Sequence, residues 1–168
     1  MVTRSLPESF SVSAGWTEDY DLWLRLAAAG VRFARLKETL FFWRDRPDRL
    51  TRTDPAYSAE AFRACKARYL SEGFLAGFRE VTLVGAGLEG RAWRRVLEAE
   101  GIAVSRWIDA DPRKQGRLLH GAPVLTADTE DISGKLLVTI GTRGTRKEVR
   151  AWLDDRGLVE GVDAVFVT

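Results

Sequence analysis

The spacing of apolar positions changes partway along the chain, and the change predicts two regions of different structure. In the second region, short apolar runs alternate with polar segments that carry apolar residues at helical spacing. The runs predict strands at 80–84, 103–108, 123–125, 135–140 and 164–167, and the segments between them predict helices over 88–100 and 145–157. Strands that alternate with helices of this length are typical of a parallel sheet with right-handed crossovers. We therefore expect an α/β fold over residues 79–168.

The first region, residues 1–78, has a different pattern. It predicts a helix over 17–29, short strands over 31–36 and 39–44, and a second helix over 54–72. Thr17 stands where an N-cap is expected, and Gly30 stands just past the end of the first helix. We therefore expect two domains, a mostly helical one with short strands over 1–78 and the parallel sheet over 79–168.

The first strand of the second region ends in a glycine-rich turn. Gly85, Gly87 and Gly90 are spaced as G-x-G-x-x-G between this strand and the next helix. This spacing is typical of Rossmann-like domains: the first glycine permits the tight turn, the second lets a phosphate approach the backbone, and the third lets the helix pack closely. The turn also places backbone N–H groups at a helix N-terminus, which favours an anion. These three residues are the expected ligand-binding glycines.

Two further features of this region have the chemistry of a nucleotide site. Asp109 follows the second strand, where Rossmann-like domains place the acid that binds a ribose hydroxyl, and Asp111 is a less well placed alternative. Arg143 and Arg146 follow a buried strand and are expected to reach a phosphate. The same residues also fit a structural role, in which the glycines only pack the helix, Asp109 caps its loop and the arginines are solvated.

Composition narrows the classes of function. The 168 residues carry 26 basic and 24 acidic side chains, and this balance gives no reason to expect nucleic acid or an anionic membrane as partner. No apolar run reaches the ~20 residues that cross a bilayer, and the start lacks a signal-peptide core. With one cysteine, Cys65, and one histidine, His120, we expect a cytoplasmic protein without an internal disulfide, a metal site or a histidine base.

The segment Glu18–Leu26, with the sequence EDYDLWLRL, resembles the acceptor half of family 2 glycosyltransferases, as do segments 30–33, 40–45 and 49–52. The resemblance implies an inverting enzyme of the GT-A type. It also implies that Asp19 is the general base that deprotonates the acceptor hydroxyl, with Glu18 beside it in the catalytic pair. Asp21 is expected to complement the helix dipole and to pair with Arg25, four residues on.

Such an enzyme needs a donor-binding half whose strands would precede Met1. The resemblance therefore implies that this chain is incomplete as an enzyme, and that a divalent metal takes part only if a donor half is supplied. An incomplete GT-A half also exposes apolar surface. We expect a second copy or a partner chain to cover the aromatic side chains of Trp16, Trp23, Phe41, Phe42 or Trp43.

Residues 79–168 resemble the Rossmann-like domain that precedes some sugar acyltransferases, through segments 84–91, 107–116, 121–124 and 139–141. This resemblance implies a nucleotide sugar or a similar nucleotide as ligand. The main hypothesis is a glycosyltransferase-related protein. The alternatives are a non-catalytic module that holds NAD, S-adenosylmethionine or another nucleotide for regulation, and a domain that serves assembly.

Overall fold

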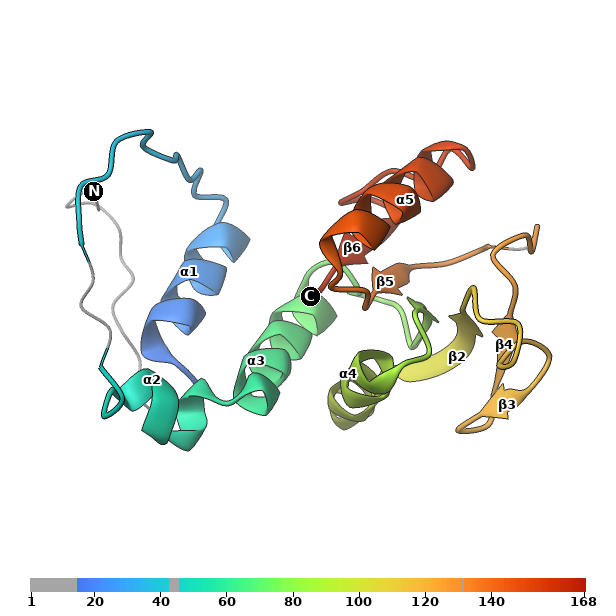
Figure 1. Ribbon diagram of the computed structural model, residues 1–168, viewed down its shortest axis with the longest axis horizontal. Helices are drawn as coiled ribbons and strands as arrows, with labels where there is room; N and C mark the ends of the chain where they lie inside the picture. The colour runs from blue at the N-terminus through green and yellow to red at the C-terminus, as the bar shows by residue number, and fades with distance from the viewer. Residues whose placement is uncertain (1–14, 43–45, 131) are drawn as a thin grey trace. The chain divides into compact units, whose positions relative to one another are not determined.

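The computed structural model describes residues 15–42, 46–130 and 132–168, except for the side chain of Arg143 (Figure 1). The chain forms two compact units, Met1–Tyr69 and Leu70–Thr168. This division lies within a helix, α3, whereas the sequence placed the boundary between residues 78 and 79. Each unit is described by itself below.

The first unit is helical. Its elements are α1 (Glu18–Ala28), α2 (Leu50–Thr53), the 3₁₀ helix η1 (Pro55–Tyr57) and α3 (Ala59–Glu72). The two predicted helices are confirmed at α1 and at η1 with α3, and α2 was not expected. Gly30 has φ of +78°, as expected for a residue that follows a helix end. Thr17 is the N-cap of α1, although its side chain makes no capping hydrogen bond.

The strands predicted at 31–36 and 39–44 are wrong for the part of these segments that the structure describes. Residues 31–36 and 39–42 form no strand, and residues 43 and 44 lie outside the described ranges. The alternating apolar side chains are exposed, with Phe33 54% and Leu40 72% accessible. An alternating pattern forms a strand only where one face is buried and a neighbouring strand takes the backbone hydrogen bonds.

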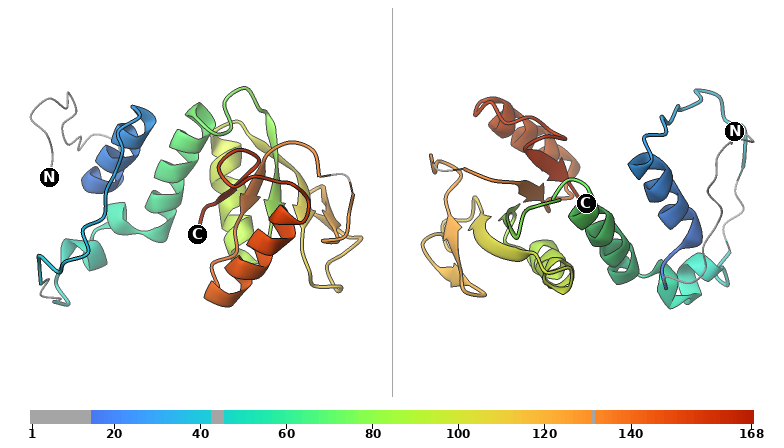
Figure 2. Two further views of the ribbon diagram at one scale, coloured as in Figure 1. Left: turned by 90° about the horizontal axis from the view of Figure 1, so that it is seen from above. Right: turned by 180° about the vertical axis from the view of Figure 1, so that it is seen from behind.

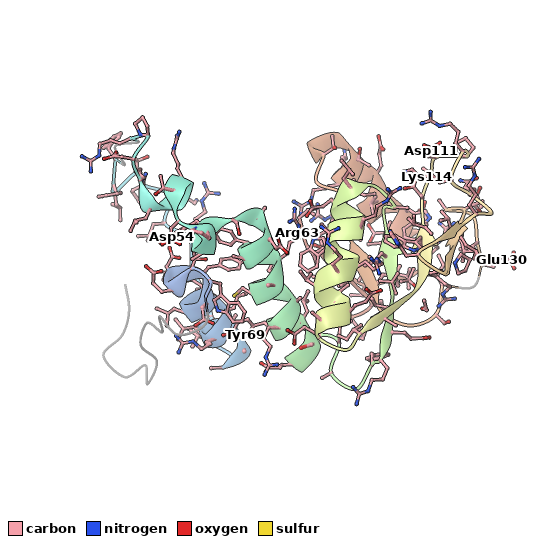
Figure 3. All side chains as sticks on the ribbon, turned by 90° about the horizontal axis from the view of Figure 1, so that it is seen from below. Asp54, Arg63, Tyr69, Asp111, Lys114 and Glu130 are labelled. Atoms are coloured by element: carbon pink, nitrogen blue, oxygen red, sulfur yellow. The ribbon has the colours of Figure 1, made fainter. Side chains whose placement is uncertain are left out.

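A buried carboxylate, Asp21, organises the helical unit. Its Oδ1 accepts hydrogen bonds from Trp16 Nε1 at 3.2 Å and from the Tyr69 hydroxyl at 2.6 Å, and its Oδ2 accepts from Arg25 Nε at 2.9 Å. The pairing with Arg25 confirms the sequence expectation, but Asp21 does more than complement the helix dipole because it joins α1 to Tyr69 of α3. Tyr69 is labelled on α3 in Figure 3. Burial alone would raise the pKa of Asp21, but the bonds from Tyr69, Trp16 and Arg25 outweigh it and lower the pKa.

Replacing Asp21 by asparagine is expected to lower the free energy of unfolding of this unit by about 1.5–3 kcal/mol at about pH 7, because hydrogen bonds to a charged group contribute that much. Since folding lowers the pKa of Asp21, its contribution is complete above the unfolded pKa of about 3.9 and is lost as pH falls through the folded value. Urea unfolding at about pH 7 and about pH 2 measures this. The difference between wild type and variant should shrink in acid, and a difference that stays constant would contradict the assignment. The exposed Asp48→Asn is the control.

The second unit contains a six-stranded sheet in the order β3-β4-β2-β1-β5-β6. Its elements are β1 (Glu80–Val84), α4 (Leu88–Ala99), β2 (Ala103–Ile108), β3 (Leu118–Leu119), β4 (Ala122–Leu125), β5 (Leu136–Val138), α5 (Arg143–Asp154) and β6 (Ala164–Phe166). All strand pairs are parallel except β3 with β4. The predicted α/β, Rossmann-like sheet is confirmed.

The two helices of this unit pack on opposite faces of the sheet (Figure 2). Val149 and Leu153 of α5 pack in one core cluster with sheet residues that include Val84 and Val138. Side chains alternate along a strand, so Leu83 and Leu137 point to the other face, and both are fully buried. Burial on both faces explains why the central strands are continuous apolar runs.

Two local predictions in this unit need correction. Helix α5 begins at Arg143 with Thr142 as N-cap, so Thr145 and Glu148 lie inside the helix and do not form the expected capping box. Strand β5 ends at Val138, because Thr139 already belongs to the turn that follows.

Candidate functional site

At two of the three glycines of the turn, neighbouring atoms of the chain leave no room for a side chain. Gly85 has φ of +107°, a conformation that favours glycine, and a Cβ there would lie 2.9 Å from Thr139 Oγ1. A Cβ on Gly90 would lie 2.0 Å from the carbonyl oxygen of Gly85. Gly85 therefore makes the turn and Gly90 lets α4 pack against it, as their spacing predicts.

The remaining glycine, Gly87, is open. It is the N-cap of α4 with φ of −85° and ψ of −166°, and its cap is not filled by a side chain. A Cβ built on Gly87 would meet nothing within 4 Å. Neither a positive φ nor packing within the described chain requires glycine at this position, and the space beside it is open to a ligand.

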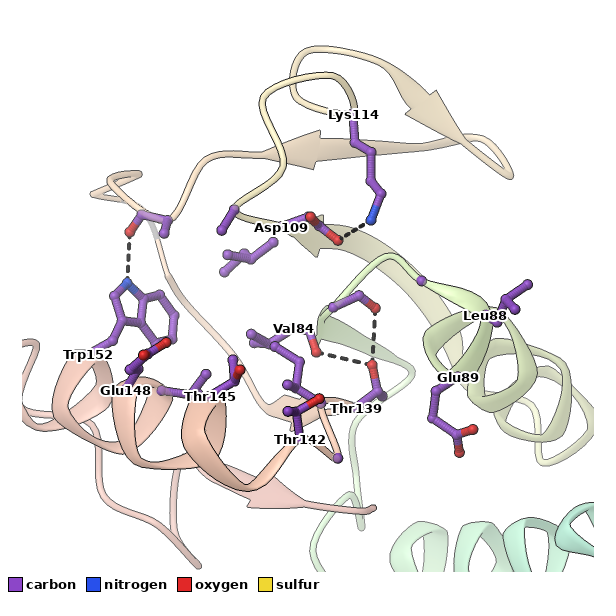
Figure 4. Close-up of a pocket in the computed structure, with 18 residues that line it drawn as sticks. Val84, Leu88, Glu89, Asp109, Lys114, Thr139, Thr142, Thr145, Glu148 and Trp152 are labelled. Carbon is purple, nitrogen blue, oxygen red and sulfur yellow. Dashed lines mark hydrogen bonds and ion pairs between the residues drawn. The ribbon is translucent and has the colours of Figure 1, made fainter.

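A cavity of about 500 Å³ lies directly at Gly87 (Figure 4). It spans the carboxyl ends of β1 and β5, where neighbouring crossovers leave in opposite directions and α/β sheets bind ligands. Its wall includes the glycine turn, the turn before α5 and one face of α5. Its lining residues include Gly87, Glu89, Asp109, Thr139, Glu148 and Trp152.

Asp109, the predicted ribose acid, holds the glycine turn in place. Its Oδ2 accepts from Ala86 N at 2.7 Å and from Lys114 Nζ at 2.9 Å, and its Oδ1 accepts from Asp111 N at 2.9 Å. Burial would raise the pKa of Asp109, but these bonds outweigh it and lower the pKa, so the group is ionised at neutral pH. A carboxylate has about four acceptor positions, so three internal donors leave about one for a ligand hydroxyl.

Three residues of the site were not predicted from the sequence. Lys114 pairs with Asp109, Thr139 Oγ1 lies 3.1 Å from the carbonyl oxygen of Val84 and 3.0 Å from that of Gly85, and Trp152 Nε1 donates to Ala127 O at 2.8 Å. For Lys114, the sequence offers one signal, which is its position five residues after Asp109. Thr139 reaches the cavity because β5 pairs with β1, and Trp152 reaches it because α5 packs on the sheet. The apolar pattern of a single strand or helix does not predict which elements become neighbours.

Of the two arginines predicted to reach a phosphate, only the side chain of Arg146 is described, and it is not among the residues that line the cavity. The side chain of Arg143 lies outside what the structure describes, although its backbone begins α5. The guanidinium of Arg146 lies over the ring of Phe166 in β6, 5.1 Å from its centroid. Asp111 pairs with Arg113 in the loop after β2, its Oδ2 2.9 Å from Arg113 Nη2.

Glu18 and Asp19, the predicted catalytic pair, lie in the first turn of α1 in the other unit. Asp19 is exposed, and its Oδ1 accepts a hydrogen bond from Tyr20 N at 2.7 Å. Among the described residues, no cluster of three or more His, Cys, Asp or Glu side chains could hold a metal ion. Over the same ranges, no helix has the length and apolar character needed to cross a membrane.

No family model and no curated protein sequence matches this chain, but solved structures do. A Rex-family repressor, RSP, matches with 16% identity and a TM-score of 0.44 over 59% of this chain and 56% of that one, so the match spans little more than half of that protein. RSP in complex with β-NADH matches with 15% identity and a TM-score of 0.42, covering 88% and 81% of the two chains. RSP with β-NAD⁺ and operator DNA matches with 14% identity and a TM-score of 0.41, covering 88% and 80%.

The identification of residues 1–78 as part of a glycosyltransferase is wrong. The three structures named above are of a repressor, RSP, and none of them is a sugar transferase. Residues 31–36 and 39–42, which lie in segments that resemble the glycosyltransferase, form no strand. The structure explains the residues of segment 18–26 in physical terms. Leu22 and Leu26 form the buried stripe of α1, and Asp21 is buried in an ion pair with Arg25. The expectation that nucleic acid is not a partner finds no support in these comparisons.

Proposed function

We propose that the chain is a non-catalytic nucleotide-binding module in which Leu70–Thr168 holds its ligand at the carboxyl ends of β1 and β5 and serves a regulatory role. The observation that carries the proposal is the contrast between glycines of one turn. Gly85 and Gly90 are enclosed by the chain, whereas the Gly87 position is empty and faces a cavity of about 500 Å³. A phosphate placed there meets the N-terminus of α4, where unpaired N–H groups and the helix dipole favour an anion.

The charges that line the cavity narrow the class of ligand. Glu89, Asp109 and Glu148 are carboxylates, and Lys114 is already paired with Asp109. Carboxylates accept hydrogen bonds from ribose hydroxyls but repel additional phosphates. We therefore expect a ligand with several hydroxyls and few phosphates, such as a dinucleotide or a nucleotide sugar, in preference to a nucleoside triphosphate.

The far side of the cavity is apolar and suits a flat ring. Ile140, Val149 and Trp152 line it, and Trp152 is fixed by its hydrogen bond to Ala127 O. A ligand that reaches from Gly87 to Trp152 contacts both α4 and α5. Binding would then favour one arrangement of these helices over others, which is the physical requirement for a regulatory effect.

The test is a thermal-shift screen of the full chain. The panel contains NADH and NAD⁺, each of which is bound in one of the similar structures, with a nucleotide sugar, S-adenosylmethionine and ATP. A ligand at about 100 times its dissociation constant should stabilise the folded state by about 2.7 kcal/mol, which is a clear rise in melting temperature. The order expected is a dinucleotide or nucleotide sugar above ATP. If no compound on the panel shifts the melting curve, the proposal is wrong.

A further inference from the structure

A second cavity, separate from the nucleotide site, lies within Met1–Tyr69. It encloses about 250 Å³ and is lined by Asp19, Tyr20, Trp23, Thr51, Tyr57 and Phe62. Most of its wall is therefore aromatic, and the one charged side chain among the lining residues is a carboxylate. The proposed nucleotide function makes no use of it.

The aromatic rings come from three elements and form a corner. Tyr20 of α1 and Phe62 of α3 have centroids 5.0 Å apart and planes 74° apart. The two rings meet edge to face, so they form adjoining walls of the cavity. Tyr57 of η1 completes the wall, and Trp23 lies one helical turn along α1 from Tyr20.

Three carboxylates lie in the segments that begin at this corner. Glu18 and Asp19 lie in the first turn of α1, and Asp54 precedes η1. Burial and then the charges of Glu18, Asp19 and Asp54 raise the pKa of Tyr57. Cations of the same unit also lie nearby: Lys66 Nζ is 5.9 Å from the Tyr20 centroid, at the outer limit of a cation–π contact, and Arg52 follows the lining residue Thr51.

We propose that this aromatic cavity is a binding site for a quaternary ammonium group. Aromatic faces attract a cation through the ring quadrupole, and a methylated ammonium combines a spread positive charge with an apolar surface that such walls accept. A hydrated divalent metal fits poorly, because it needs six or more oxygen ligands and the lining offers the Asp19 carboxylate and few others. The Asp19 carboxylate supplies the opposite charge at the rim.

The test compares choline with its neutral isostere, 3,3-dimethylbutan-1-ol, in saturation-transfer NMR and calorimetric titrations of the full chain. The two compounds have the same shape, so their difference isolates the charge. Choline should bind about tenfold more tightly than the alcohol, the ratio expected for a partly desolvated cation–π contact. Equal affinity for both compounds, or no saturation transfer to the choline methyl groups, would overturn the proposal.

Two substitutions locate the site. Asp19→Asn should weaken choline binding about threefold or more, because it removes the carboxylate at the rim. Asp48→Asn removes the same charge from an exposed position that is not part of the lining, and it should leave the affinity within error. An equal loss in both variants would mean that choline responds to net charge and not to this cavity, which would also overturn the assignment. Because Asp19 is exposed, its replacement leaves the buried core of the unit unchanged.

Discussion

Replacing Gly90 by alanine is expected to lower the free energy of unfolding of Leu70–Thr168 by about 2 kcal/mol or more. The added Cβ would lie 2.0 Å from the carbonyl oxygen of Gly85 and 3.1 Å from Trp107 Cζ3. Overpacking costs about 1–3 kcal/mol where side chains can shift, and here the obstacle is backbone, so the cost lies at or above the upper end. The better helix propensity of alanine returns at most about 1 kcal/mol.

Urea unfolding by circular dichroism measures this loss, with amide hydrogen exchange in β1 reporting the second unit separately. Gly144→Ala is the matched control, because Gly144 also lies in a helix and a Cβ there meets nothing within 4 Å. The control should be unchanged or more stable by up to about 1 kcal/mol. If Gly90→Ala proved as stable as Gly144→Ala, the close contact between α4 and the glycine turn would be wrong.

Replacing Gly87 by valine is expected to affect ligand binding strongly and stability only a little, in contrast to Gly90→Ala. The backbone at Gly87 is extended, which valine adopts readily, and a Cβ meets nothing within 4 Å, so the loss of stability should stay near the cost of a poorer N-cap, about 1 kcal/mol. The side chain would fill the space that we assign to a phosphate. Affinity for whichever ligand stabilises the wild type should fall about 100-fold or more, which removes the stabilisation of about 2.7 kcal/mol.

Calorimetric titration of wild type and variant with that ligand gives both affinities. Ala99→Val is the control, because it adds bulk to the exposed end of the same helix, outside the cavity lining. A Gly87→Val variant that is stable and still binds with unchanged affinity would show that the ligand does not approach this glycine. A variant that is destabilised by well over the N-cap cost of about 1 kcal/mol would show that the position is less open than the structure indicates.

The sheet of the second unit was predictable because each strand carries its own signal. β1 and β5 are buried on both faces and appear as continuous apolar runs, and α4 is bounded by Gly87 and by Gly101, which has φ of +75°. The short strand β3 was missed because Leu118 and Leu119 are too few to show a period. Its pairing with β4 depends on a hairpin turn in which His120 takes φ of 52° and Gly121 takes 83°.

The first unit shows where pattern alone is insufficient. Residues 31–36 alternate like a strand, but alternation specifies only a side-chain period, and the described structure provides no paired neighbour for that segment. The sequence predicts only that Asp21 complements the helix dipole and pairs with Arg25, because it stands in the acidic first turn of α1. Its burial depends on Tyr69, 48 residues away, whose hydroxyl donates to it. A contact between residues this far apart is a product of the tertiary fold and has no local sequence signal.

The candidate nucleotide site was predictable in part for the same reason. Gly85, Gly87 and Gly90 could be placed because turn geometry and helix packing impose their spacing. Lys114 and Trp152 could not, because a loop and a different helix bring them to the cavity. The charge of the cavity, with Glu89 and Glu148 on its wall, likewise depends on how α4 and α5 flank the sheet.

The account rests on a ligand that occupies the space at Gly87, and backbone amide NMR tests this most directly. The full chain, labelled with ¹⁵N, is titrated with the compound that gives the largest thermal shift. The largest changes are expected at the amides of Gly87, Leu88 and Glu89, which begin α4, and at Thr142, which caps α5. Changes confined to other parts of the chain, or a spectrum that does not change with any nucleotide of the panel, would contradict the account.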